Sequence, residues 1–139
     1  MNTKLKVWIG ALACLAMTLP AWAGDFVIIV NKDNGNDVNQ ELAAKAYRGE
    51  AKTWAGGGSI NAIALPEDNA VRVAFDKEVL GKAPSQTKAM WAALTFSGKA
   101  APPKVVDSES DVVKAVADNK NAIGYVSAKA AGAGVKIVK

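Results

Sequence analysis

Two short runs of apolar, mostly β-branched residues restrict the fold of this chain more than any other feature. Residues 26–30 read FVIIV, and residues 122–126 read AIGYV. Neither run alternates between apolar and polar side chains, so each predicts a strand that is buried on both faces of a sheet. Helices must then cover both faces, which favours an α/β fold.

The segments between these runs alternate between helix and strand patterns. Apolar residues at helical spacing, preceded by capping side chains and bounded by glycine or proline, predict four helices. Weaker strands are predicted at 60–64, 104–106 and 135–138. The sequence therefore predicts an α/β fold with a single sheet, mixed or mostly parallel, flanked by helices. The helix boundary signals are Asp37 or Asn39 and Gly49, Asp68 or Asn69 and Gly81, Pro84 or Ser85 and Gly98, and Ser108 or Ser110 at the start of the last.

Composition excludes several classes of function. The 139 residues contain no histidine and one cysteine, which removes histidine-based catalysis, histidine-ligated metals, internal disulfides and cysteine zinc clusters. No nucleophile–base pair and no calcium-loop spacing is found, so we expect no enzyme activity, no metal and no cofactor. The formal charge is +4, but the lysines are scattered among acids without a basic stripe, which argues against nucleic acid as a partner.

The first residues are typical of a secretory signal peptide. Two lysines begin it, an apolar stretch follows at 7–18, and small residues flank a cleavage site at 21–23. We expect a signal peptide over 1–23, cleaved after Ala23, and a mature domain over 24–139 in the periplasm or outside the cell. The alternative is a lipoprotein signal in which Cys14 is acylated.

Several segments together resemble a known family. They are VIIVNK at 27–32, AYRG at 46–49, Trp54, WAALTFSG at 91–98 and AIGYV at 122–126. Their order and spacing resemble those of phosphate-binding periplasmic proteins over nearly the whole mature chain. The resemblance implies a type II periplasmic-binding fold, in which two lobes close on a ligand, and this chain matches one such lobe.

The resemblance also locates the ligand loops. In the family, a loop with serine, glycine and threonine binds phosphate after the strand that precedes the middle helix. Residues 65–72 take that place here and carry the carboxylates Glu67 and Asp68 instead. A further contact region of the family matches 106–111, where hydroxyl groups remain beside additional acids.

Four residues are the candidates for ligand binding: Asn69, Arg72, Ser108 and Ser110. Each lies at the start of a predicted helix that follows a strand, where open α/β sheets bind ligands. Arg72 could hold an oxyanion through two parallel hydrogen bonds. The alternative is that Asn69 and the serines only cap their helices and that Arg72 is a surface residue. The aromatic residues are predicted to be core: Tyr47, Trp54, Phe75, Trp91 and Tyr125.

Two functional hypotheses follow. The first is an exported solute-binding-like domain that takes phosphate, another small anion or a polar solute for transport or sensing. The second is an envelope protein-interaction domain that has lost ligand binding and that contacts a transporter or envelope protein, or pairs with itself as a homodimer.

Overall fold

The two apolar runs pair side by side as neighbouring strands of one five-stranded sheet. The computed structural model describes residues 26–138, and the strand order of its sheet is β3-β2-β4-β1-β5. The strands are β1 (Val27–Asn31), β2 (Asn61–Ala64), β3 (Lys104–Val105), β4 (Ala122–Val126) and β5 (Val135–Ile137). The predicted α/β fold with a single sheet flanked by helices is confirmed.

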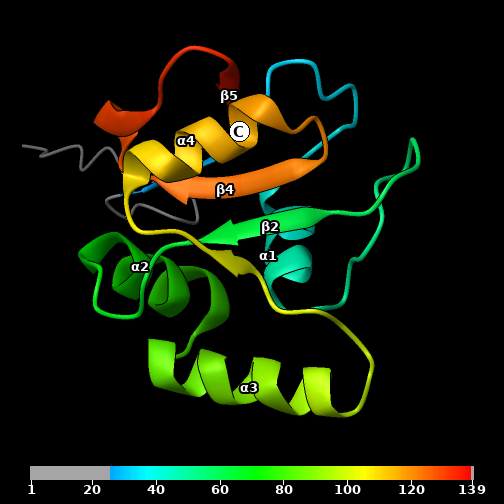
Figure 1. Ribbon diagram of the computed structural model, residues 1–139, viewed down its shortest axis with the longest axis vertical. Helices are drawn as coiled ribbons and strands as arrows, with labels where there is room; N and C mark the ends of the chain where they lie inside the picture. The colour runs from blue at the N-terminus through cyan, green and yellow to red at the C-terminus, as the bar shows by residue number, and fades with distance from the viewer. Residues whose placement is uncertain (1–25, 139) are drawn as a thin grey trace, which may run out of the picture.

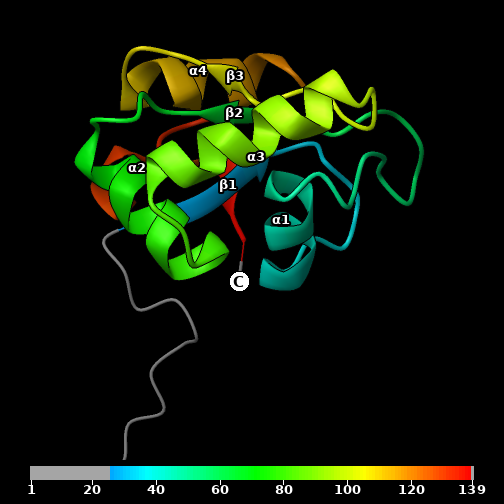
Figure 2. The ribbon, with the colours of Figure 1, turned by 90° about the horizontal axis from the view of Figure 1, so that it is seen from below.

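Helices cover both faces of the sheet. Figure 2 shows α4 on one face and α1 and α2 on the other, while Figure 1 shows α3 beyond the side that β2 and β3 form. The helices are α1 (Gln40–Tyr47), α2 (Ala70–Phe75), the π-helical turn η1 (Asp76–Leu80), α3 (Pro84–Phe96), α4 (Glu109–Asp118) and the 3-10 turn η2 (Ala128–Ala130).

The sheet is mixed. Strand β2 runs parallel to β3 and β4, whereas β1 is antiparallel to both β4 and β5. The carboxyl ends of the three parallel strands therefore meet at one edge of the sheet. We call the segments that follow them, residues 65–69, 106–108 and 127, the carboxyl edge.

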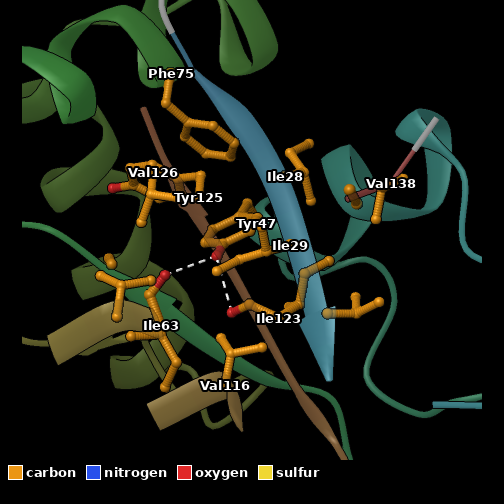
Figure 3. Packing of buried hydrophobic residues seen from close by; sticks show 14 of the residues in the cluster. Ile28, Ile29, Tyr47, Ile63, Phe75, Val116, Ile123, Tyr125, Val126 and Val138 are labelled. Carbon is orange, nitrogen blue, oxygen red and sulfur yellow. Dashed lines mark hydrogen bonds between the residues drawn. The ribbon is translucent and has the colours of Figure 1, made fainter. Parts of the chain in front are cut away.

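Side chains from both faces of the sheet make the core. Against α4, Gly124 leaves room for two valines, since a Cβ there would lie 2.6 Å from Val112 Cγ1 and 3.1 Å from Val116 Cγ2. On the opposite face, Phe75 stacks on Tyr125 with ring centroids 3.9 Å apart. Figure 3 shows Tyr47 among them, its hydroxyl 2.7 Å from the Ile63 carbonyl oxygen.

Where the sequence offered two possible capping residues for a helix, the structure shows which of them caps it. Asn39, Asn69 and Ser108 cap α1, α2 and α4 with their side chains, while Gly49 and Gly81 follow helices with φ of 77° and 64°. The second predicted helix differs in form, because its last turn is the π-helical η1. The predicted signal peptide and Cys14 lie outside the described residues. Within 26–138, no helix has the length and apolar character needed to span a membrane.

Candidate functional site

The carboxyl edge carries two of the four candidate residues, Asn69 and Ser108, and Ser110 follows shortly after it. Asn69 ends the segment after β2, and its side-chain oxygen accepts the backbone N–H of Val71 at 2.8 Å. The side chain therefore caps α2, in agreement with the interpretation of Asn69 as a helix-capping residue. The amide nitrogen of this half-buried side chain takes no part in that bond and can donate hydrogen bonds.

Arg72 is held inside the protein. The residue is 7% exposed, its Nε lies 3.0 Å from Asp76 Oδ2, and its Nη1 donates to the Leu65 carbonyl oxygen at 2.8 Å. The interpretation of Arg72 as a surface residue is therefore wrong. Helical spacing brings Arg72 and Asp76 together across one turn, and the folding of α2 onto the sheet buries the pair.

Burial of this pair shifts the pKa of the Asp76 carboxyl group. Burial raises the pKa of Asp76 above the usual value for its carboxyl group, because the charged form loses its contact with water. The hydrogen bond and the positive charge of Arg72 oppose this rise. The pair is a neutral unit in which each charge compensates the burial of the other.

Ser108 and Ser110 lie together at the first turn of α4. Their hydroxyl oxygens are 3.0 Å apart, and Ser108 Oγ accepts the backbone N–H of Asp111 at 3.2 Å. Ser108 therefore caps the helix. Both hydroxyls also lie at a helix end whose first N–H groups and dipole favour an anion.

Glu109 ties this turn to the end of β4. Its carboxylate accepts the backbone N–H of Ser127 at 2.5 Å, while the buried Ser127 Oγ has no hydrogen-bond partner within 26–138. A negative charge thus already occupies one donor at the carboxyl edge. From the sequence, Glu109 is only an acid beside the serines, because nothing local links it to a strand end 18 residues away.

The structure separates the candidates into two places. Ser108 and Ser110 share the first turn of α4, whereas Arg72 lines a hollow between α3 and the sheet. None of Asn69, Ser108 and Ser110 lines that hollow. Among the described residues, no group of three or more acids, cysteines or histidines is placed to hold a metal ion.

A comparison with protein families relates this arrangement to known proteins. The model of the PBP superfamily domain matches residues 8–138, which is most of the chain. The chain belongs to the PBP superfamily. The fold agrees with this assignment, since solved structures of substrate-binding proteins superimpose on this PBP-superfamily chain.

Three of those structures show how far the similarity extends. An ABC-type phosphate transport receptor from Vibrio cholerae has a TM-score of 0.58 at 19% identity, over 84% of this chain and 46% of its own. A putative phosphate ABC transporter substrate-binding protein with bound phosphate from Clostridium perfringens has a TM-score of 0.64 at 22% identity, over 84% and 44%. PstS from Borrelia burgdorferi has a TM-score of 0.61 at 16% identity, over 84% and 47%.

Two further facts bound the comparison. The PBP-superfamily chain spans less than half the length of these solved relatives. The search of curated proteins returned no significant match. At these identities the likeness establishes the fold alone, and the names of these neighbours describe a phosphate transport receptor and a substrate-binding protein.

Proposed function

We propose that this chain is an exported solute-binding domain that holds a small oxyanion, such as phosphate, for transport or sensing. Its place would be the periplasm or the space outside the cell. The observation that carries the proposal is membership of the PBP superfamily, combined with the shared edge at which β2, β3 and β4 end. In open α/β sheets, ligands bind outside the carboxyl ends of the strands.

In this proposal the candidates have distinct roles. The hydroxyls of Ser108 and Ser110 share one hydrogen bond, so one of the two donates to the ligand at the first turn of α4. Asn69 donates from its amide nitrogen after β2. Arg72 would contribute its remaining N–H donors rather than free positive charge, because its charge is paired with that of Asp76. Its guanidinium has five N–H donors, and two are used in the bonds to Asp76 and Leu65.

Thermal unfolding of the purified chain with phosphate, sulfate and other oxyanions tests this function. A ligand at 100 times its dissociation constant stabilises the folded state by ~2.7 kcal/mol. Ser110→Ala should weaken the anion several-fold, because a donor to a charged group is lost. Ser85→Ala, an exposed serine on α3, is the matched control and should bind as the parent does. Equal affinity in both variants would remove Ser110 from the site.

The second hypothesis, an interaction domain without a ligand, has one observation in its favour. The Glu109 carboxylate already takes the Ser127 N–H, and Glu67 and Asp68 lie exposed after β2, so several negative charges surround the proposed site. A folded protein that no oxyanion stabilises would support this function. Light scattering for a homodimer and pull-down of envelope or transporter proteins are then the deciding measurements.

A further inference from the structure

The loop between β1 and α1 contains the one Asn–Gly pair of the sequence, Asn34-Gly35. This loop lies at the end of the sheet opposite to the carboxyl edge, because β1 runs antiparallel to β4 (Figure 1). In an Asn–Gly pair, the backbone nitrogen of the glycine can attack the side-chain carbonyl carbon of the asparagine, since no Cβ hinders its approach. The product is a five-membered succinimide ring, which water opens to aspartate or isoaspartate.

The side chain of Asn34 is folded over the backbone of Gly35. Asn34 Oδ1 accepts the backbone N–H of Asn36 at 2.9 Å, which closes a ring of atoms that includes the side-chain carbonyl carbon of Asn34 and the nitrogen of Gly35. Such a turn mimics a backbone turn, and the side chain follows the course of the main chain. Asn34 is 2% exposed, so packing holds the side chain in place. The carbonyl carbon and the nitrogen that would attack it therefore belong to one compact ring.

Two donors converge on the carbonyl oxygen at which charge would develop. Besides the backbone N–H of Asn36, its side-chain Nδ2 donates to Asn34 Oδ1 at 2.8 Å. The Asn36 side chain is itself held, because its Oδ1 accepts the backbone N–H of Gly56 at 2.8 Å. Attack by the glycine nitrogen places a negative charge on the Asn34 oxygen, and fixed donors stabilise such a charge.

The two nitrogens of this reaction make no hydrogen bonds. Asn34 Nδ2, which would leave as ammonia, is buried and has no partner within residues 26–138. The backbone N–H of Gly35 likewise has no acceptor in the part of the chain that the structure describes. Gly35 is exposed, and nothing lies within 4 Å of a Cβ built on it, so water and hydroxide can reach this N–H. The attacking nitrogen is therefore open to deprotonation, and the leaving nitrogen is not held.

We propose that Asn34-Gly35 is a self-modification site, at which Asn34 loses ammonia in the folded protein with the assistance of Asn36. Gly35 N gives its proton to hydroxide and bonds to Asn34 Cγ, while the carbonyl electron pair moves to Oδ1. When this pair returns, the Cγ–Nδ2 bond breaks, and the nitrogen takes a proton from water and leaves as ammonia. Water then opens the ring at either carbonyl, which yields an aspartate or an isoaspartate. The reaction is independent of the proposed oxyanion function, since the loop lies away from the carboxyl edge.

The modification would change the loop in two ways. It places a carboxylate where the Asn34 side chain is buried, and burial of an unpaired charge costs stability. An isoaspartate also lengthens the main chain by a carbon atom, beside the Asn34 carbonyl oxygen that accepts Lys136 Nζ. We expect the modified chain to unfold at a lower temperature, so that the domain loses stability as it ages.

Peptide mapping by mass spectrometry tests the proposal, after incubation of the folded full chain at neutral and mildly alkaline pH. Three asparagines that are followed by alanine serve as internal controls: Asn61, Asn69 and Asn121. Conversion of Asn34 should be several-fold faster than conversion of any of them, and it should accelerate with pH as more of the glycine N–H is deprotonated. Ion exchange separates the modified chain, and thermal unfolding then measures its loss of stability.

Two variants separate the contributions to the reaction. Gly35→Ala should slow it several-fold, because a Cβ hinders the attacking nitrogen although the fold has room for that Cβ. Asn36→Ala removes the side-chain donor but keeps the backbone donor, and should slow the reaction by about two- to tenfold, the range of one net hydrogen bond. Gln40→Ala removes a similar amide from the start of α1 and, as the matched control, should react at the parent rate.

Several results would overturn the proposal. One is conversion of Asn34 in the urea-unfolded chain but not in the folded chain, which would show that the fold protects the pair. Equal conversion at the control asparagines, or the parent rate in Gly35→Ala, would also contradict it. A faster reaction in Asn36→Ala would show that this side chain restrains Asn34 rather than assisting its reaction.

Discussion

At the scale of single residues, charge at the carboxyl edge is the decisive property. Glu109 places its own carboxylate on the Ser127 N–H, a donor that an anionic solute would otherwise use. Like charges repel at short range, and the repulsion grows where water is partly excluded. In the proposed oxyanion site, this side chain should therefore lower the affinity that the serines beside it provide.

Replacing Glu109 by Gln should tighten oxyanion binding by about tenfold, equal to ~1.4 kcal/mol, because the charge is lost while an oxygen remains for the Ser127 N–H. Isothermal titration with phosphate measures this change. Asp111→Asn removes the same charge from the same turn without touching the Ser127 contact, and should have a smaller effect. Equal effects would show that only the overall charge of the turn matters.

At the scale of elements, the close approach of α4 to β4 depends on one residue without a side chain. Gly124 lies under Val112 and Val116, and α4 rests on the strand there. The buried Arg72–Asp76 pair has a comparable role where α2 passes into η1, since it links the two helical segments to each other and to the end of β2. Each of these two contacts leads to a separate prediction for the free energy of unfolding.

Gly124→Ala should lower the free energy of unfolding by about 1–3 kcal/mol, the usual cost of overpacking a core. The added Cβ would lie 2.6 Å from Val112 Cγ1, so the helix or the strand must shift. Urea unfolding measures the loss. Gly35→Ala is the control, because nothing lies within 4 Å of a Cβ there, and it should be close to neutral.

Asp76→Asn should cost about 3–5 kcal/mol, because it leaves the Arg72 guanidinium charged and buried without its counter-ion. The Glu41–Lys45 pair has the same i,i+4 spacing but exposed side chains, at 74% and 46%. Glu41→Gln should therefore change stability by less than about 0.5 kcal/mol. Similar losses in the two variants would show that burial does not decide the strength of these pairs.

The extent to which the sequence predicts these elements depends on how local each signal is. Strands β1 and β4, and the caps Asn39, Asn69 and Ser108, follow from neighbouring residues and were predictable. The burial of Arg72 was not, since it depends on how α2 packs on the sheet. For the same reason, no local pattern links Glu109 to Ser127 or shows which strands are antiparallel.

At the scale of the whole molecule, both tyrosines of the chain are buried in one aromatic cluster with Phe26 and Phe75. Burial raises the pKa of Tyr47 and of Tyr125 above the usual phenol value. The two rings link α1 to β4, so ionisation of either hydroxyl would place a charge in the centre of the domain.

The domain should therefore lose stability at alkaline pH. Above about pH 10 the unfolded chain releases its tyrosine protons while the folded chain keeps them, so the free energy of unfolding falls as pH rises. Each tyrosine contributes a slope of up to about 1.4 kcal/mol per pH unit in this window. Urea unfolding between about pH 8 and 11 measures the slope, and Tyr125→Phe should make it shallower. An unchanged slope in that variant would contradict the prediction.

The place of β1 in the sheet also determines when the chain can complete it. Both neighbours of β1 come from much later in the sequence, since Val30 pairs with Ile123 on one side and with Lys136 on the other. Contacts of such long sequence separation form late and slowly. In chain order, the FVIIV segment has no neighbouring strand to pair with before residues 122–126. Strand β1 therefore joins the sheet late, whereas β2 can already pair with β3 before β4 has been made.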